Sequence, residues 1–321
     1  MGLVRQDDEE CATCPAQRAG RARRAARVRC ATLVLLAVAA SATACSDPQA
    51  HDPHARPGAH GPQQPKAPVR DYFATHPRAL YARRAAAIRT WGVAEVPLAA
   101  PAPPARKPRI VSRKGLGIQG GTDLPPVFTT VPTADKVVFL TVDDGAEKDP
   151  DFVRMMDDLK IPYTAFVHDY LNDDDGDGYG YFRRARDLGA ALGNATLHDR
   201  YLPGLPYDVQ REEVCGMQDV MAREFGRRPT VLRPVGGSYD TDTLRAAKSC
   251  GVRYVPLWNA EVFADRWEFR QWDGRLHPGD IVLTHLPGTP QARGTMPGVM
   301  RRFLEKVTGA GYAVARLEDY L

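Results

Sequence analysis

Several strand-like apolar segments of this sequence end in side chains that could do chemistry. Asp143 and Asp144 follow the apolar run KVVFLTV, and Arg233, Trp258 and His285 end three later runs. Two adjacent carboxylates at the end of a buried strand are costly unless they hold a cation or move a proton. An isolated Asp-Asp-Gly would be explained by a turn that caps the next helix. Because four separate strand ends carry such groups, we favour a site.

The elements that must position these residues alternate between strands and helices. Residues 149–159 predict a helix, with Asp149 as N-cap and Pro150 at its first position. Further helices are predicted from about residue 208, over 240–251 and around 299–307, between strands at 136–144, 162–167, 229–234, 252–258, 280–286 and 312–317. This alternation favours a parallel sheet or barrel with helices outside, where sites gather at the carboxyl ends of strands.

The first 45 residues predict export. Six arginines between residues 18 and 29 precede an apolar run, 31–44, that is too short to span a bilayer. The tetrad Ala-Thr-Ala-Cys ending at Cys45 resembles a bacterial lipobox, in which a lipid is attached to the cysteine. We therefore predict a lipoprotein on the outer face of the cell membrane, with secretion after a plain signal peptide as the alternative.

The remaining chain divides into a tether and a folded domain. Residues 46–126 are rich in Pro and Ala and predict a mostly disordered tether, with a possible short helix at 76–92. Residues 127–321 form the predicted domain. Without residues 1–44 the Lys+Arg total falls from 43 to 36 and the Asp+Glu total from 39 to 35, so the net charge is near +1. This balance excludes the concentrated basic field that a nucleic-acid partner requires.

The motifs and their order resemble the polysaccharide deacetylase family, the NodB-homology carbohydrate esterases. FLTVDDG is similar to the family's TFDDG, LRPVGG to RPPYG, and IVLTH to I-V-L-x-H, while LWNAEVF stands where an acidic and Trp motif is expected. The resemblance covers residues 130–321. It implies a distorted (β/α) barrel with fewer than eight regular strands. It also implies hydrolysis of N- or O-acetyl groups on a glycan such as peptidoglycan or a chitin-like oligosaccharide.

The same resemblance implies a role for each matched residue. Asp143 would be the general base, oriented by Arg233, and His285 would be the general acid. Asp144 would bind a divalent metal, zinc in the family, which polarises the carbonyl group and supplies hydroxide near neutral pH. Leu283 would line the pocket for the acetyl methyl group. Trp258 would contact the substrate.

The metal-binding motif of this chain departs from the family pattern. The family sequence H-T/S-x-x-H falls on ATLHD, residues 195–199, so both expected imidazoles are absent. Ala195 has no donor atom, Asp199 could offer oxygen, and His198 lies one residue from the expected position. A site of Asp144, Asp199 and water suits magnesium, manganese or calcium better than zinc. We therefore predict weak or absent zinc binding.

Further departures leave the activity open between two main functions. Val235-Gly236 replaces Pro and an aromatic residue, and Asn259 and Glu261 replace the expected acids, so the group that orients His285 is not evident. The first interpretation is an exported deacetylase with impaired metal binding. The alternative is an inactive glycan-binding lipoprotein of the cell envelope, with sugar platforms at Trp258, Trp267 and Trp272. A purely structural lipoprotein is the third.

Two smaller features complete the predictions. Cys215 and Cys250 are the only cysteines after residue 45, and an exported domain with two thiols favours a disulfide over two buried free thiols. NDDDGDG, residues 172–178, is similar to a calcium loop, but the twelfth position from Asp173 is Arg184 instead of a bidentate Glu. An acidic surface loop is predicted there.

Overall fold

The computed structural model describes residues 73, 75–118, 123–172, 178–287 and 294–321. The predicted export signal, most of the tether before residue 75 and the acidic stretch 173–177 lie outside the described residues. Among the helices that are described, none has the length and apolar character needed to cross a membrane.

The central strand is β2 (Val137–Asp143), which carries the Asp pair at its carboxyl end. Its first six residues are buried, as expected for a β-branched and aromatic strand covered on both faces. It pairs in parallel with three strands: β3 (Thr164–Val167), β8 (Ile281–His285) and β9 (Ala313–Ala315). The register places Asp143 directly beside His285. Two of the predicted site residues are thus neighbours across a strand pair.

The strands form a ring. The main sheet has the order β4-β3-β2-β8-β6-β7, with β4 at Ala191–Asn194, β6 at Ala260–Val262 and β7 at Trp267–Phe269. A smaller sheet joins β1 (Val127–Phe128) to β5 (Val255–Pro256). From the end of β4, a parallel bridge joins Asn194 to Leu232, and a second joins Val231 to Tyr254, just before β5. On the other side, the amide of Ile281 in β8 donates a hydrogen bond to the carbonyl oxygen of Thr129, just after β1. These bonds connect the two sheets around the core. The distorted (β/α) barrel that the family resemblance implies is confirmed.

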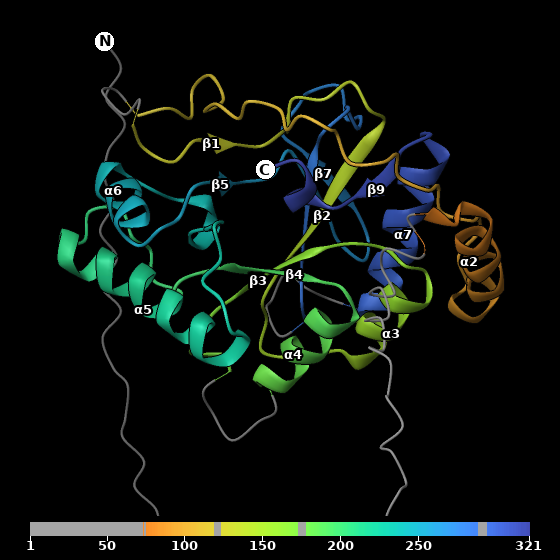
Figure 1. Cartoon of the computed structure of the whole chain (residues 1–321), viewed down its shortest axis with the longest axis horizontal. Coiled ribbons are helices and arrows are strands. Elements are labelled where there is room, and N and C mark those ends of the chain that lie inside the picture. Colours follow the sequence, from red (N-terminus) through yellow and green to blue (C-terminus); the bar gives the residue numbers. More distant parts are fainter. Residues whose placement is uncertain (1–72, 74, 119–122, 173–177, 288–293) are drawn as a thin grey trace, which may run out of the picture. The chain divides into compact units, whose positions relative to one another are not determined.

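Helices surround these strands, as Figure 1 shows. The remaining elements are α2 (Pro77–Trp91), α3 (Pro150–Asp158), α4 (Gly178–Leu188), α5 (Tyr207–Phe225), η1 (Val235–Gly237), α6 (Thr241–Ser249), α7 (Met296–Gly309) and η2 (Leu317–Asp319). The predicted start of α3 is confirmed, because the Asp149 side chain accepts hydrogen bonds from the amides of Asp151 and Phe152. The sequence patterns did not predict α4, β1, β4, β6 or β7, and the predicted strand at 229–234 forms only isolated bridges at Val231 and Leu232.

The segment before the barrel corrects one prediction. The short helix is present as α2, but residues 75–118 are not a free tether. Arg84 is 3% exposed and donates hydrogen bonds to the carbonyl oxygens of Leu159 and Lys160 in the barrel and of Pro97 and Leu98 in its own segment. A Pro- and Ala-rich chain has few apolar side chains to bury, but its backbone carbonyls still accept hydrogen bonds. Arg84 therefore helps to hold this segment to the domain, together with contacts such as the hydrogen bond from Trp91 Nε1 to Asp158 Oδ2 at 2.9 Å.

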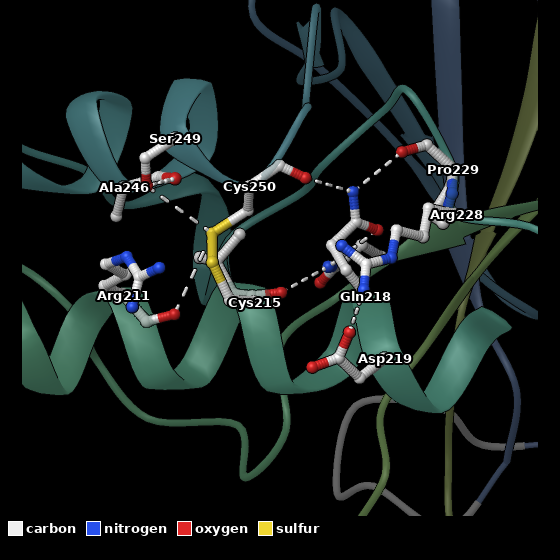
Figure 2. The surroundings of a disulfide bond; sticks show 11 residues. Arg211, Cys215, Gln218, Asp219, Arg228, Pro229, Ala246, Ser249 and Cys250 are labelled. Atoms are coloured by element: carbon white, nitrogen blue, oxygen red, sulfur yellow. Dashed lines mark hydrogen bonds and ion pairs between the residues drawn. A yellow bond between two sulfur atoms is a disulfide. The ribbon is translucent and has the colours of Figure 1, made fainter. Parts of the chain in front are cut away.

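The predicted disulfide between Cys215 and Cys250 is confirmed. It joins α5 to the residue that follows α6, with a Cα–Cα distance of 5.1 Å. Figure 2 shows Gln218 beside the bond, donating to the carbonyl oxygens of Cys250 and Pro229 at 3.0 Å each. Covalent and hydrogen-bonded links therefore fix these two helices to one another.

Candidate active site

Asp143 and Arg233 form the inner part of the site. Arg233 is 1% exposed, and its Nη1 lies 2.8 Å from Asp143 Oδ1. The same nitrogen donates to Thr141 Oγ1, and Nε donates to the Pro256 carbonyl oxygen at 3.0 Å. The guanidinium carbon lies 4.2 Å from the centre of the Phe166 ring. Burial lowers the pKa of Arg233, and the charge of Asp143 opposes that shift. Arg233 is held from several sides, so it can fix the orientation of Asp143.

His285 lies on the other side of Asp143. Its Nε2 is 4.0 Å from Asp143 Oδ2, and its Nδ1 is 3.2 Å from Glu261 Oε1. Glu261 therefore orients the imidazole, which the sequence left open. Asn259 has a structural role instead, because it is buried and donates to Asp280 Oδ1 at 2.8 Å. Carboxylates thus flank both ring nitrogens of His285.

These carboxylates control the protonation of His285. Burial by itself lowers the pKa of His285, but the Glu261 hydrogen bond and the charges of Asp143 and Glu261 outweigh it and raise the pKa above 6.5. A proton on His285 therefore binds more tightly in the folded protein than in the unfolded chain. The resulting stabilisation is complete below the unfolded pKa and is lost as the pH rises through the folded pKa.

Replacing Glu261 by glutamine is expected to lower the pKa of His285, because burial remains while the carboxylate hydrogen bond, the largest interaction that raises this pKa, and the charge of Glu261 are removed. The imidazole resonances of His285, followed by NMR across the pH range, measure this shift directly. His277→Gln, which changes a histidine that lies close to Asp273 and Asp280 instead, provides an assignment control. An unchanged titration of His285 in Glu261→Gln would contradict the assigned contact.

Asp144 has a different environment from Asp143. Its side chain is fully buried, and Oδ1 lies 2.5 Å from Lys148 Nζ and accepts from the Gly145 amide at 2.8 Å. Oδ2 accepts from Asn172 Nδ2 at 2.7 Å. Both oxygens of the predicted metal ligand are therefore engaged by protein donors. Neither Lys148 nor the side chain of Asn172 was predicted from the sequence, although a lysine four residues after Asp144 was a visible signal.

The side chains of segment 195–199 contact partners other than Asp144. Ala195 is buried in an apolar cluster that includes Phe166. The amide and Nδ1 of His198 each lie 2.9 Å from the carboxylate of Glu213 on α5, so α5 holds this imidazole. Asp199 has a left-handed backbone with φ of 53°, and its Oδ1 lies 3.5 Å from Nε2 of His168.

A zinc site of the family type does not fit these residues. Within the ranges that the structure describes, no three His, Cys, Asp or Glu side chains are grouped so as to hold a metal ion. Catalytic zinc requires three protein ligands and an open position. Asp144 is the one expected ligand present, and its oxygens are already occupied.

The structure adds residues of the β3 end to this region. His168 directly follows β3 and is buried, with its Nδ1 lacking a hydrogen-bond partner. Tyr170 donates to Asp199 Oδ2 at 3.3 Å, and burial together with the charges of Asp199 and Asp144 raises the pKa of Tyr170 to about 12. The strand-end rule that identified His285 could also have identified His168.

Of the two predicted substrate-binding residues, Trp258 lies beside the catalytic residues and Leu283 does not line the neighbouring cavity. Trp258 lies beside Arg233, with the guanidinium carbon 5.6 Å from its ring centre. Leu283 precedes His285 by two residues on β8, but it is fully buried and does not line the small cavity beside His285, which is bounded by residues such as Phe263, Thr284 and Met296.

Two of the three proposed sugar platforms lie elsewhere. Trp267 stacks on Phe303 of α7 and Phe269 of β7, and so belongs to the apolar packing. Trp272 is 99% exposed, but it follows β7, which is antiparallel to β6, and therefore lies toward the amino ends of β6 and β8. Of the three, only Trp258 adjoins the predicted catalytic residues.

Comparison with known proteins agrees with this arrangement. The sequence model of the polysaccharide deacetylase family matches residues 130–255. An uncharacterized protein of Streptomyces coelicolor is 45% identical over 202 residues, which are 63% of this chain and 79% of that protein.

Solved structures show the same fold at low sequence identity. A family 4 carbohydrate esterase from Bacillus anthracis has a TM-score of 0.52 and 20% identity, over 70% of this chain and 98% of that one. A Bacillus anthracis protein described as a CE4 family pseudoenzyme has a TM-score of 0.50 and 17% identity, over 61% of this chain and 69% of that one. The family match therefore identifies a polysaccharide deacetylase domain of the NodB type in this chain, and the structural comparison shows that this domain has the fold of the family 4 carbohydrate esterases.

Proposed function

We propose that the protein is an exported polysaccharide deacetylase-like protein that hydrolyses acetyl groups on a cell-envelope glycan, with impaired metal binding. The proposal of hydrolysis rests on the proximity of the candidate general base, Asp143, and the candidate general acid, His285. Asp143 and His285 face each other at 4.0 Å, and each has its own positioning partner, Arg233 and Glu261. The export and the lipid anchor on Cys45 rest on the sequence of residues 1–45.

The two groups suit the two proton transfers of an acyl hydrolysis. Asp143, oriented by Arg233, would accept a proton from the attacking water. His285, whose pKa is raised, would carry the proton that the departing nitrogen or oxygen requires. Asp144 is paired with Lys148 and Ala195 offers no ligand, so carbonyl polarisation by a metal is impaired and turnover is slow.

The alternative is an inactive glycan-binding protein of the cell envelope. The closed pairing of Asp144 favours it, and so does the similarity of fold to a Bacillus anthracis CE4 family pseudoenzyme. A variant of that pseudoenzyme is described as having restored enzymatic activity, which shows that an inactive site on this fold can be repaired. In this chain Trp258 and the groups around Arg233 would provide the sugar contacts.

Acetate release and glycan binding, measured on the same acetylated chitooligosaccharides and peptidoglycan, separate these functions. We expect binding together with slow acetate release, and a further loss of about 100-fold in release for Asp143→Asn, as expected for a general base. Asp219→Asn, on the exposed face of α5, serves as the matched control. Binding without acetate release would establish the alternative. Acetate release that is unaffected by Asp143→Asn would contradict catalysis by this site.

The membrane location is tested separately, by fractionating cells that express the wild type or Cys45→Ala.

A further inference from the structure

We infer that the ammonium group of Lys148 is an internal cation that occupies the place where the family holds its metal at Asp144. The inference deepens the proposed function, because it names the residue that impairs metal binding. It has a specific consequence. Restoring the two missing imidazoles at positions 195 and 199 is insufficient for metal binding as long as Lys148 is present.

The contacts of Lys148 leave little of its ammonium free. Its Nζ lies 2.5 Å from Asp144 Oδ1 and donates to the Gly145 carbonyl oxygen at 2.7 Å. It also lies 5.3 Å from the centre of the Phe182 ring, in the range of a cation–π contact. The Lys148 side chain is 15% exposed and that of Asp144 is 0% exposed. The ammonium group therefore neutralises Asp144 in the interior and is not presented to a substrate.

The loop that carries Lys148 is firmly placed. Lys148 directly precedes Asp149, the N-cap of α3, and the Asp149 side chain also accepts from the Met296 amide at 3.1 Å. At the other end of the loop, a Cβ on Gly145 would come within 2.3 Å of the Leu286 carbonyl oxygen after β8. Because both ends of the loop are fixed, the ammonium group of Lys148 is held at Asp144.

The other oxygen of Asp144 is also closed. Asn172 Nδ2 donates to it at 2.7 Å and to the His168 carbonyl oxygen at 2.6 Å, so the amide is held between two acceptors. A divalent ion at Asp144 would have to displace the ammonium group before it gained a first ligand. Removing Lys148 instead leaves a buried carboxylate without its counter-charge, and such a group gains strongly from a new cation.

Zinc titration of four purified full-length proteins tests the inference. These are the wild type, Ala195→His/Asp199→His, Lys148→Ala, and the triple variant that combines all three changes. Histidine is one of the residues that tolerate a left-handed backbone, as position 199 requires. We expect no stoichiometric zinc in the wild type and weak binding in the double variant. The triple variant should bind one zinc ion about 10- to 100-fold more tightly than the double variant, the range for changes in the surroundings of a metal ligand.

A matched control separates a specific effect from a general loss of positive charge. Lys160 is a half-buried lysine that pairs with Asp157 three residues earlier, away from the site. Lys160→Ala in the double-histidine background should leave zinc affinity at the level of the double variant. Equal zinc affinity in the double and triple variants, or stoichiometric zinc in the wild type, would overturn the inference.

A second measurement keeps the test valid if the added imidazole at 195 disturbs folding. The variant Lys148→Met retains an aliphatic chain over Phe182. Its thermal unfolding is measured in the presence of manganese and in the presence of a chelator. Manganese should raise the melting temperature of this variant and leave that of the wild type unchanged. The same response in both proteins would contradict the inference. Failure of the proposed hydrolysis appears in acetate release, which neither measurement uses.

Discussion

Replacement of Arg233 by methionine is expected to lower the free energy of unfolding by about 3–5 kcal/mol, the usual cost of removing one partner of a buried ion pair. The Asp143 carboxylate loses its closest counter-charge, and the Pro256 carbonyl oxygen and Thr141 hydroxyl lose the same donor group. The packing of the guanidinium group against Phe166 is lost as well. This one residue joins β2 to two other parts of the ring.

Urea unfolding of the wild type and Arg233→Met measures the difference. Arg245→Met is the matched control, because Arg245 also pairs with an aspartate at 2.7 Å but is 57% exposed. Exposed pairs contribute about 0–1 kcal/mol, so the control should be nearly neutral. Adding Asp143→Asn to Arg233→Met should recover part of the loss, because the unpaired charge is then absent. Equal effects of the two arginine substitutions would show that Arg233 is not the internal support of the site.

Loss of the disulfide between Cys215 and Cys250 is expected to cost about 4 kcal/mol. The bond closes a loop with a sequence separation of 35, and the loop-entropy relation gives this value for that length. The loss of stability should extend to the site, because α5 holds the residues at the end of β4 and just after it. The Asn194 side chain donates to the Val214 carbonyl oxygen at 2.9 Å, and Glu213 binds His198.

Denaturant unfolding of Cys215→Ala/Cys250→Ala, compared with the oxidised and reduced wild type, measures this cost. The double variant and the reduced protein should agree closely. Hydrogen exchange should show reduced protection in α5 and α6 and in residues 194–199, while the amides of β2 remain protected. A stability change below about 1 kcal/mol would indicate that the hydrogen bonds of Gln218 hold the two helices without the bond.

Several features of this protein were predictable from local sequence. The buried β2 strand is a continuous apolar run, and the start of α3 is marked by Asp149 and Pro150. The convergence of Asp143 with His285 follows from the rule that parallel strands end at one edge of a sheet. The disulfide followed from two cysteines in a domain predicted to be exported. In each case the sequence pattern that predicts the feature lies within one secondary-structure element or follows a general rule for the fold class.

The tertiary structure alone showed which group neutralises Asp144 and which group orients His285. Lys148 reaches Asp144 through a loop, and Glu261 reaches His285 from β6, a strand of three residues that is too short for a periodic pattern. Residues 75–118 pack on the domain through polar contacts such as those of Arg84 with backbone carbonyls and of Trp91 with Asp158, interactions that composition does not reveal. Sequence periodicity reports which face of an element is apolar. The partner of a polar side chain instead depends on where loops and neighbouring strands place donors in space, and that is set by the packing of the whole barrel.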